Sequence, residues 1–230
     1  MSANVVRPMA SLTNSGFQIE HGVLSPAECD GVLATSIEAI SSAVGSRSLL
    51  SFRWCQELAA KLRAHHKLRD IVSPEFVATQ CTYFSKSSAV NWLVPIHQDL
   101  SIPVAERSAS PELRGWSEKQ GEIFVQPPAA VLERLVALRL HLDSCSVADG
   151  PLQVVPGSHS CGVVSPETAS SIGRSGERVS VTLGRGDILA MRPLLLHASS
   201  KASGSSKRRV LHFLFGPPTL PHGLRWRHAV

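Results

Sequence analysis

The residues best suited to chemistry are a histidine and an aspartate two positions apart. His97 and Asp99 fall within residues 93–100, an apolar run that is typical of a β-strand. Alternate side chains of a strand share one face, so the imidazole and the carboxylate would point into the same space. This pair could bind a metal ion, although a histidine capped by a nearby aspartate is also a common structural arrangement.

A further histidine, His197, lies 100 residues later, at the end of an apolar run that follows a Gly-Asp turn. A lone histidine at such a place is more often structural than functional. Two histidines and one carboxylate from separate strands, however, form the facial triad that binds Fe(II) and leaves three positions open. We therefore predict a metal site at His97, Asp99 and His197, with room for a chelating cosubstrate and dioxygen.

Two arginines, Arg208 and Arg209, begin another run of apolar residues. If one of them pointed into a barrel, its planar guanidinium could form paired hydrogen bonds with a carboxylate. The distal end of a dicarboxylate cosubstrate would need such a partner. The simpler alternative is that both arginines remain solvated at the strand edge.

The elements that would position these residues form a mainly β pattern with helices in front. Short β-rich runs are separated by Gly, Pro, Asn, Asp and Ser, which favours a sandwich or jelly roll over a βαβ sheet. The expected strands are 16–20, 77–84, 93–100, 135–142, 152–155, 178–183, 188–196 and 210–215. One expected helix is opened by Ser25 and Pro26 and runs to Ile40, and a second covers 54–66.

The whole chain, 1–230, is predicted to be a single domain. We expect residues 1–15 to form a flexible arm, 16–72 a strand and packing helices, and 73–216 the jelly-roll core. Residues 101–130 contain four prolines and are predicted to be a long loop, either a lid or a plain surface connection. The tail, 217–230, would pack on the barrel or against a second subunit.

The chain has 230 residues and a modest net charge of +5, and its composition is typical of globular proteins. The basic residues are scattered rather than clustered, so we expect no nucleic-acid partner. The sequence has no secretory signal and no run of 18 apolar residues, so we expect a cytoplasmic protein without a membrane partner. The charge slightly favours an anionic small-molecule substrate.

These signals, together with the segment DGPLQVVPGSH at 149–159, closely resemble the phytanoyl-CoA dioxygenase family of Fe(II)/2-oxoglutarate oxygenases. The resemblance spans about 16–216 and implies a double-stranded β-helix, a jelly-roll (cupin-like) core with iron near its mouth. It implies that His97, Asp99 and His197 are the metal ligands. It also implies that Arg208, eleven residues beyond His197, binds 2-oxoglutarate, with Arg209 as the alternative if the strand is shifted by one.

The resemblance implies an oxidoreductase that uses Fe(II), 2-oxoglutarate and O2, hydroxylates a small organic molecule, and releases succinate and CO2. Related halogenases have a small residue in place of the carboxylate, so Asp99 favours hydroxylation. The alternatives are a jelly-roll metal-binding or zinc-dependent hydrolytic protein, or a non-catalytic relative.

Further residues are candidates for the site on weaker grounds. Gln98 and Asn91 are predicted to border the cosubstrate, although asparagine is also a common turn residue. Arg139 and His141 share one strand face, which would either line the barrel or lie outside it. On the predicted loop, Trp116 could close over a bound substrate.

Overall fold

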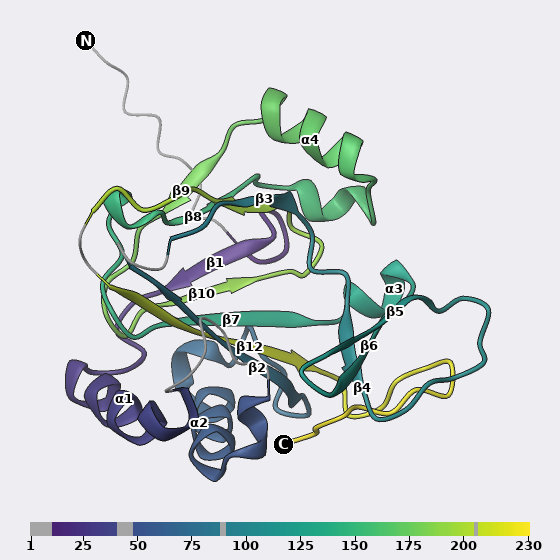
Figure 1. Cartoon of the computed structure of the whole chain (residues 1–230), viewed down its shortest axis with the longest axis horizontal. Helices are drawn as coiled ribbons and strands as arrows, with labels where there is room; N and C mark the ends of the chain where they lie inside the picture. The colour runs from purple at the N-terminus through teal and green to yellow at the C-terminus, as the bar shows by residue number, and fades with distance from the viewer. Residues whose placement is uncertain (1–10, 41–47, 88–90, 205–206) are drawn as a thin grey trace.

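Two antiparallel β-sheets face each other in the computed structural model, which describes residues 11–40, 48–87, 91–204 and 207–230 (Figure 1). The larger sheet has the strand order β1-β10-β7-β12-β2, and the smaller sheet has the order β3-β11-β8-β9. This arrangement confirms the predicted jelly-roll core. The strands of the two sheets are β1 (Phe17–Glu20), β2 (Val77–Lys86), β3 (Val94–His97), β7 (Val136–His141), β8 (Leu152–Val154), β9 (Val179–Val181), β10 (Ile188–Met191), β11 (His197–Ser199) and β12 (Arg208–Gly216).

The larger sheet is buried on both faces, and its strands alternate between them. On β12, Leu211 and Phe213 join the apolar cluster that includes residues of α1 (Pro26–Ile40) and α2 (Arg53–Ala64), the helices drawn below the sheet in Figure 1. Leu214, the next residue along β12, belongs to the cluster between the two sheets. Because side chains alternate with a period of two, each strand supplies one row to the helices and one row to the interior.

Two helices, α1 and α4, show how the local sequence sets helix ends. Ser25 and Glu28 form a reciprocal cap at the start of α1, where the Ser25 amide donates to the Glu28 carboxylate over 2.7 Å. The prediction of α1 is therefore confirmed, and the second predicted helix is present as α2. An unpredicted helix, α4 (Pro166–Ser175), begins with the same Ser-Pro signature, since Ser165 accepts a hydrogen bond from the Thr168 amide. Single turns of 3₁₀ helix add η1 (Leu49–Ser51), η2 (His66–Leu68), η3 (Val147–Asp149) and η4 (Ser158–Cys161).

Residues 101–130 are not the loop that the prolines suggested. They form a small sheet of β4 (Ile102–Val104), β6 (Glu122–Gln126) and β5 (Arg114–Lys119), followed by α3 (Ala129–Leu132). Pro103 fits because β4 is an edge strand, where a missing N–H leaves no partner unsatisfied. A tight turn at Gln120 and Gly121, both with positive φ, joins β5 to β6.

The predicted strand 188–196 is two strands in two different sheets. β10 ends at Met191, and a turn closed by the Leu195 amide and the Arg192 carbonyl follows it. Pro193 in this turn cannot donate to a ladder, so the chain leaves the larger sheet there. The next strand, β11, therefore begins with His197 on the smaller sheet.

Both ends of the described chain pack on the barrel. Leu12 is buried, and the Ser15 carbonyl accepts a 2.9 Å hydrogen bond from the Gly157 amide, so residues 11–15 are not a loose arm. The rest of the predicted arm, 1–10, lies outside the described residues. In the tail, Trp226 pairs with Val104, and Val230 with Ala78.

Within the described ranges, no helix has the length and apolar character needed to cross a bilayer.

We predict that Gly186→Ala destabilises the fold much more than Gly121→Ala does. Both glycines have a positive φ, of 83° and 75°. A Cβ at Gly186 would also overlap the carbonyl oxygen of Leu24, whereas a Cβ at Gly121 would meet open space. We expect Gly121→Ala to cost about 1 kcal/mol and Gly186→Ala about 3 kcal/mol or more in urea unfolding. Equal losses would contradict this assignment of close packing.

Candidate metal centre

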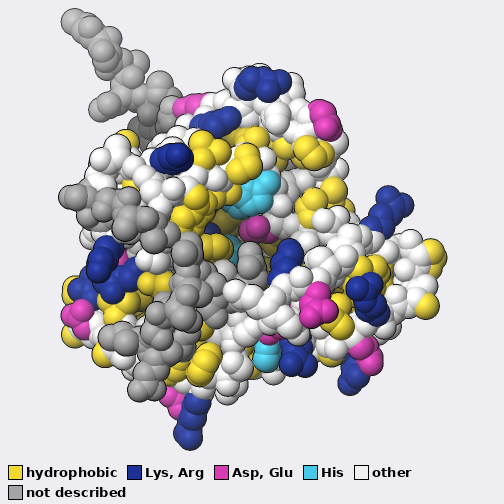
Figure 2. Space-filling view, in the orientation of Figure 1, with side chains coloured by type: hydrophobic (Ala, Val, Ile, Leu, Met, Phe, Trp, Pro, Cys, Tyr) yellow, Lys and Arg dark blue, Asp and Glu magenta, His cyan; other side chains and the backbone are white. Residues whose placement is uncertain are grey.

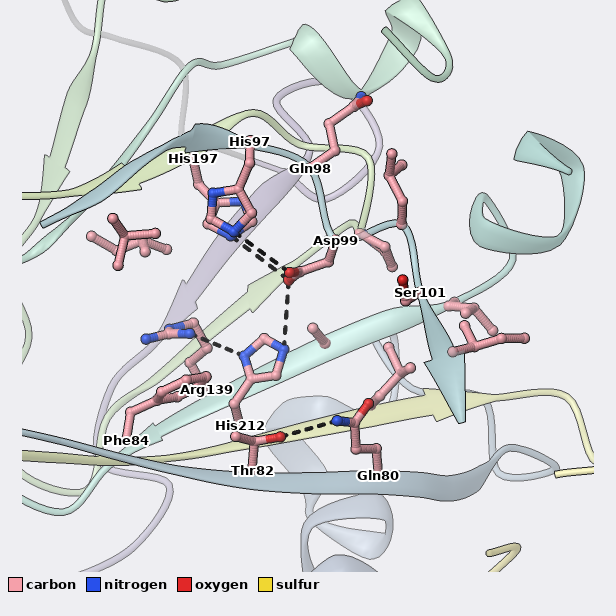
Figure 3. A pocket seen from close by; sticks show the side chains of 18 of the residues that line it. Gln80, Thr82, Phe84, His97, Gln98, Asp99, Ser101, Arg139, His197 and His212 are labelled. Carbon is pink, nitrogen blue, oxygen red and sulfur yellow. Dashed lines mark hydrogen bonds and ion pairs between the residues drawn. The ribbon is translucent and has the colours of Figure 1, made fainter. Parts of the chain in front are cut away.

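Pairing of β3 with β11 brings the two predicted histidine ligands together. The register sets His97 opposite His197, with ring centroids 4.2 Å apart. Asp99 follows β3 and turns its carboxylate toward both rings (Figure 3). The His97 Nε2 lies 3.8 Å from Asp99 Oδ1, and the His197 Nε2 lies 3.7 Å from Asp99 Oδ2. One ligand atom from each of the three residues therefore fits within a sphere of metal coordination, all within 4.8 Å of one another.

Hydrogen bonds to backbone carbonyls set the tautomer of both histidines. The Nδ1 atom of His97 lies 2.9 Å from the carbonyl oxygen of Pro95, and that of His197 lies 2.9 Å from the carbonyl oxygen of Leu195. A carbonyl can only accept, so each Nδ1 carries the hydrogen. The Nε2 lone pairs are consequently free to bind a metal, as metal-ligating histidines require.

Electrostatics keep His197 and Asp99 in the protonation states that metal ligands need. Burial lowers the pKa of His197 to about 4, so its imidazole is neutral at pH 7. Burial alone would raise the pKa of the Asp99 carboxyl, but His197, His212 and His97 outweigh it and the net shift is downward. Asp99 is therefore an ionised carboxylate at neutral pH.

The side chains of Gln98 and Asn91 form hydrogen bonds with backbone groups. The Gln98 amide donates over 2.7 Å to the carbonyls of Gly162 and Leu194, and its oxygen accepts from the Val164 amide. Figure 3 shows it turned away from the triad. The Asn91 side chain forms two hydrogen bonds with the backbone of Ala202, over 2.7 and 2.8 Å. Both side chains hold chain segments in place. Gln98 also lines the cavity, whereas Asn91 is not among the lining residues, and the predicted cosubstrate contacts of both remain predictions.

A cavity of about 310 Å³ opens beside the triad. Figure 2 shows a hollow on this face with histidine and acidic side chains in it. Strands of both sheets and of the β4–β6 sheet line the cavity. The lining residues that the argument uses are Gln80, Arg139, Ser199, Arg208, His212 and Leu214.

The two adjacent arginines have different surroundings. Arg209 forms paired hydrogen bonds with the carboxylate of Asp143, both of 2.7 Å. Arg208 is buried, lines the cavity and donates to the carbonyl of Gly150, and its Nε has no hydrogen-bond partner among the described residues. Because the two residues are neighbours on β12, only one of them can face the interior. The structure turns Arg208 toward the cavity.

Two side chains behind and beside the cavity were missed by sequence reasoning. Lys86 is buried, and its ammonium group donates to Ser199 Oγ over 2.9 Å and to the Ser200 carbonyl over 2.7 Å. Burial lowers the pKa of Lys86 to about 8. His212 lines the cavity, with its Nε2 3.8 Å from Asp99 Oδ2. His212 could have been found from the sequence, because it lies four residues after Arg208 on the same strand and therefore on the same face.

Of the remaining residues that the sequence singled out, some face the interior and others lie outside the cavity. Arg139 and His141 both face the interior, but only Arg139 lines the cavity. Trp116 lies on β5, half-buried beneath Arg107 and outside the cavity lining. The Nε2 atom of His159 lies 3.1 Å from the carbonyl oxygen of Thr13. Because a carbonyl oxygen only accepts, His159 donates this hydrogen bond.

Comparison with known proteins places these features in context. The model of the family described as phytanoyl-CoA dioxygenase (PhyH) matches residues 13–210. Iron-bound HygX from Streptomyces hygroscopicus has 18% identity and a TM-score of 0.64, covering 92% of this chain and 86% of HygX. The non-heme alpha-ketoglutarate-dependent epimerase SnoN from nogalamycin biosynthesis has 16% identity and a TM-score of 0.64, with 90% and 80% coverage. No protein of curated description matches this chain.

We predict that Asp99→Ala weakens the binding of Mn(II) or Ni(II) by about 100-fold or more, because one of three ligand groups is lost. Isothermal titration of the purified protein measures this. Glu118→Ala removes an exposed carboxylate on β5 and serves as the control, with unchanged affinity expected. Equal affinities of Asp99→Ala and the wild type would refute the triad.

We predict that the metal-free protein loses stability as the pH falls from about 6.5 toward 4. Burial lowers the pKa of His141 to about 3, so the unfolded chain binds a proton there that the folded chain excludes. This contribution to stability is complete above pH 6.5 and is lost on acidification, by at most about 1.4 kcal/mol per pH unit. Unfolding curves across this pH range should show a shallower dependence for His141→Gln. The same slope in both proteins would contradict the assignment.

Proposed function

Because this chain belongs to the phytanoyl-CoA dioxygenase family, we propose that it is an Fe(II)- and 2-oxoglutarate-dependent dioxygenase that hydroxylates a small organic molecule. The observation that carries the proposal is the triad of His97, Asp99 and His197, whose ligand atoms lie within 4.8 Å of one another beside a cavity. Succinate and CO2 would be the products of the cosubstrate. HygX has been solved with nickel and 2-oxoglutarate bound, which supports the same cofactors here.

The residues present fit Fe(II). Two neutral imidazole nitrogens and one carboxylate on a single side of the ion are the donor set of the facial triad, and the other side faces the cavity. Bound there, iron would supply the activation of dioxygen and the oxidation of the cosubstrate. The protein's own contribution is to hold the three ligands, to orient the cosubstrate and substrate, and to limit the access of water.

Arg208 is the candidate for the far carboxylate of 2-oxoglutarate. Its guanidinium is buried in the cavity wall, and among the described residues no acidic side chain lies within 4 Å of it. Lys86 holds the Ser199 hydroxyl at the same end of the cavity, so Ser199 offers a second polar contact. A buried cation that lacks an anion is unfavourable, and a cosubstrate carboxylate would remove that cost.

The cavity is polarised along its strands, which bears on the substrate. Arg139 and Arg208 lie at one end of the lining residues of β7 and β12, while Ala137 and Leu214 lie further along the same strands. Apolar residues from the β4–β6 sheet and α3 extend that second end: Ile102, Phe124 and Leu132. Lys119 of β5 also lines the cavity there, with its ammonium group 4.9 Å from the centre of the Phe124 ring. We therefore propose that the substrate presents an apolar group to the metal, while Lys119 leaves room for an anionic group elsewhere on it.

The alternative functions make different demands on this site. A zinc-dependent hydrolase could use the same His, Asp and His ligands but has no need of Arg208. A non-catalytic relative would have no need to keep two histidines in the metal-binding tautomer beside an ionised carboxylate. The presence of Asp99 also favours hydroxylation over halogenation, while the description of SnoN as an epimerase means that the reaction outcome needs its own test.

We predict that Arg208→Gln raises the 2-oxoglutarate concentration needed to saturate the anaerobic Fe(II) protein by about 10- to 100-fold. The weak visible charge-transfer band of the chelated complex reports binding. Arg209→Gln is the matched control, because the adjacent guanidinium is paired with Asp143 outside the cavity. Tight zinc binding without any band in the wild type would instead support the hydrolytic or binding-module alternative.

A further inference from the structure

Arg139 is a second cation in the cavity that the proposed function leaves unused. It comes from the middle of β7, is 7% exposed, and lines the same cavity as the triad. Its guanidinium lies over the ring of Phe84 at 5.3 Å, and one of its terminal nitrogens lies 3.2 Å from His212 Nδ1 (Figure 3). Its Nε has no hydrogen-bond partner in the part of the chain that the structure describes.

Among the residues that the structure describes, no carboxylate forms a direct ion pair with this guanidinium, and Asp99 reaches it only through His212. Of the ion pairs within 4 Å formed by described residues, none includes Arg139. An aromatic ring and a neutral imidazole compensate poorly for the water that a buried guanidinium has lost. A buried, donor-rich and incompletely satisfied guanidinium in a cavity wall is suited to a carboxylate that arrives from outside.

The contact with His212 also settles the tautomer of that histidine. Arginine can only donate, so His212 Nδ1 must accept and its Nε2 carries the hydrogen. This is the opposite tautomer from that of His97 and His197, whose Nε2 atoms are bare. His212 is therefore not a fourth metal ligand in this state, and it directs an N–H toward Asp99 Oδ2, 3.8 Å away.

Arg139 is the arginine nearer to the metal ligands. It is linked through His212 to Asp99, and Arg208 and Asp99 are the charged groups that act on it most strongly. Arg208, the second arginine in the cavity wall, donates a hydrogen bond to the carbonyl of Gly150. Because both guanidiniums line the cavity and Arg139 is linked to Asp99, a five-carbon diacid bound at the triad could meet Arg139 near its metal-binding end and Arg208 at its far end.

We propose that Arg139 is a second cosubstrate-binding residue, which receives the carboxylate next to the oxo group of 2-oxoglutarate, while His212 positions the guanidinium. Arg208 receives the far carboxylate. This assignment rests on the proposed function, since it requires that a 2-oxo acid binds at the triad.

Ligand truncation separates the two arginines. 2-Oxopentanoate has the same carbon chain and oxo acid group as 2-oxoglutarate but lacks the far carboxylate. Binding of each acid to the Mn(II)-loaded full chain is measured by calorimetry, with competition against 2-oxoglutarate where affinity is low. We expect Arg139→Gln to weaken both acids by a similar factor, about 10- to 100-fold, and Arg208→Gln to weaken 2-oxoglutarate alone.

Thermal unfolding of the metal-free variants tests for a merely structural role. Removal of a buried cation without an anionic partner should leave the melting temperature of Arg139→Gln unchanged or higher than that of the wild type. A structural role predicts a clear decrease instead. His212→Gln, which keeps a donor near the position of Nε2, should retain more 2-oxo acid affinity than His212→Leu does.

The outcomes are distinguishable. If Arg139→Gln weakened only 2-oxoglutarate, the residue would serve the far carboxylate, and if it weakened neither acid, it would serve another ligand; both results overturn the assignment. A wild type that binds Mn(II) but neither acid would overturn the proposed function and this assignment together. Normal 2-oxoglutarate binding with an unaffected Arg139→Gln would overturn the assignment alone.

Discussion

The site depends on the pairing of two short strands, β3 and β11. Only this register sets His97 opposite His197, and a slip of one residue would turn one imidazole to the other face of the sheet. So short a ladder needs support from outside itself. The Asp99 amide donates to the Pro193 carbonyl, and the Gln98 amide binds the Leu194 carbonyl, which ties the end of β3 to the turn before β11. These hydrogen bonds of the Asp99 amide and the Gln98 side chain hold the triad residues in place.

The larger sheet places charged side chains in the interior of the protein, and this burial must be offset elsewhere. Arg139, Arg208 and Lys86 are all buried near the cavity, and burial of cations disfavours folding. The other face of the same strands is apolar beyond Arg209: Leu138, Leu140, Leu211, Phe213 and Phe215 pack in the cluster that includes α1 and α2. Each buried side chain of this size contributes about 1.5–3 kcal/mol. Strand alternation thus places the stabilising row and the functional row on the same strands.

The cavity itself is assembled from parts that are far apart in the sequence. The cationic end comes from β7 and β12, the metal ligands from β3 and β11, and the apolar end from the small β4–β6 sheet and α3. The small sheet shares no strand pairing with the two core sheets, but Ile102, Val125 and Leu132 of the small sheet and α3 pack in the same apolar cluster as β10 and β12. This division is consistent with a fold that HygX and SnoN share at 16–18% identity.

The sequence by itself determined the features that depend on local spacing. The capped helix α1 and most core strands follow from caps within four residues or from a period of two. The His-x-Asp pair and the distal His197 are indicated by their residue types and by the family resemblance, since β3 ends at His97 and Asp99 lies just beyond it. Tertiary structure alone decided which of Arg208 and Arg209 faces inward, that Arg139 enters the cavity, and that Gln98 and Asn91 serve the backbone. It also turned 101–130 into a sheet. These outcomes depend on which distant strands become neighbours, and no local pattern records that pairing.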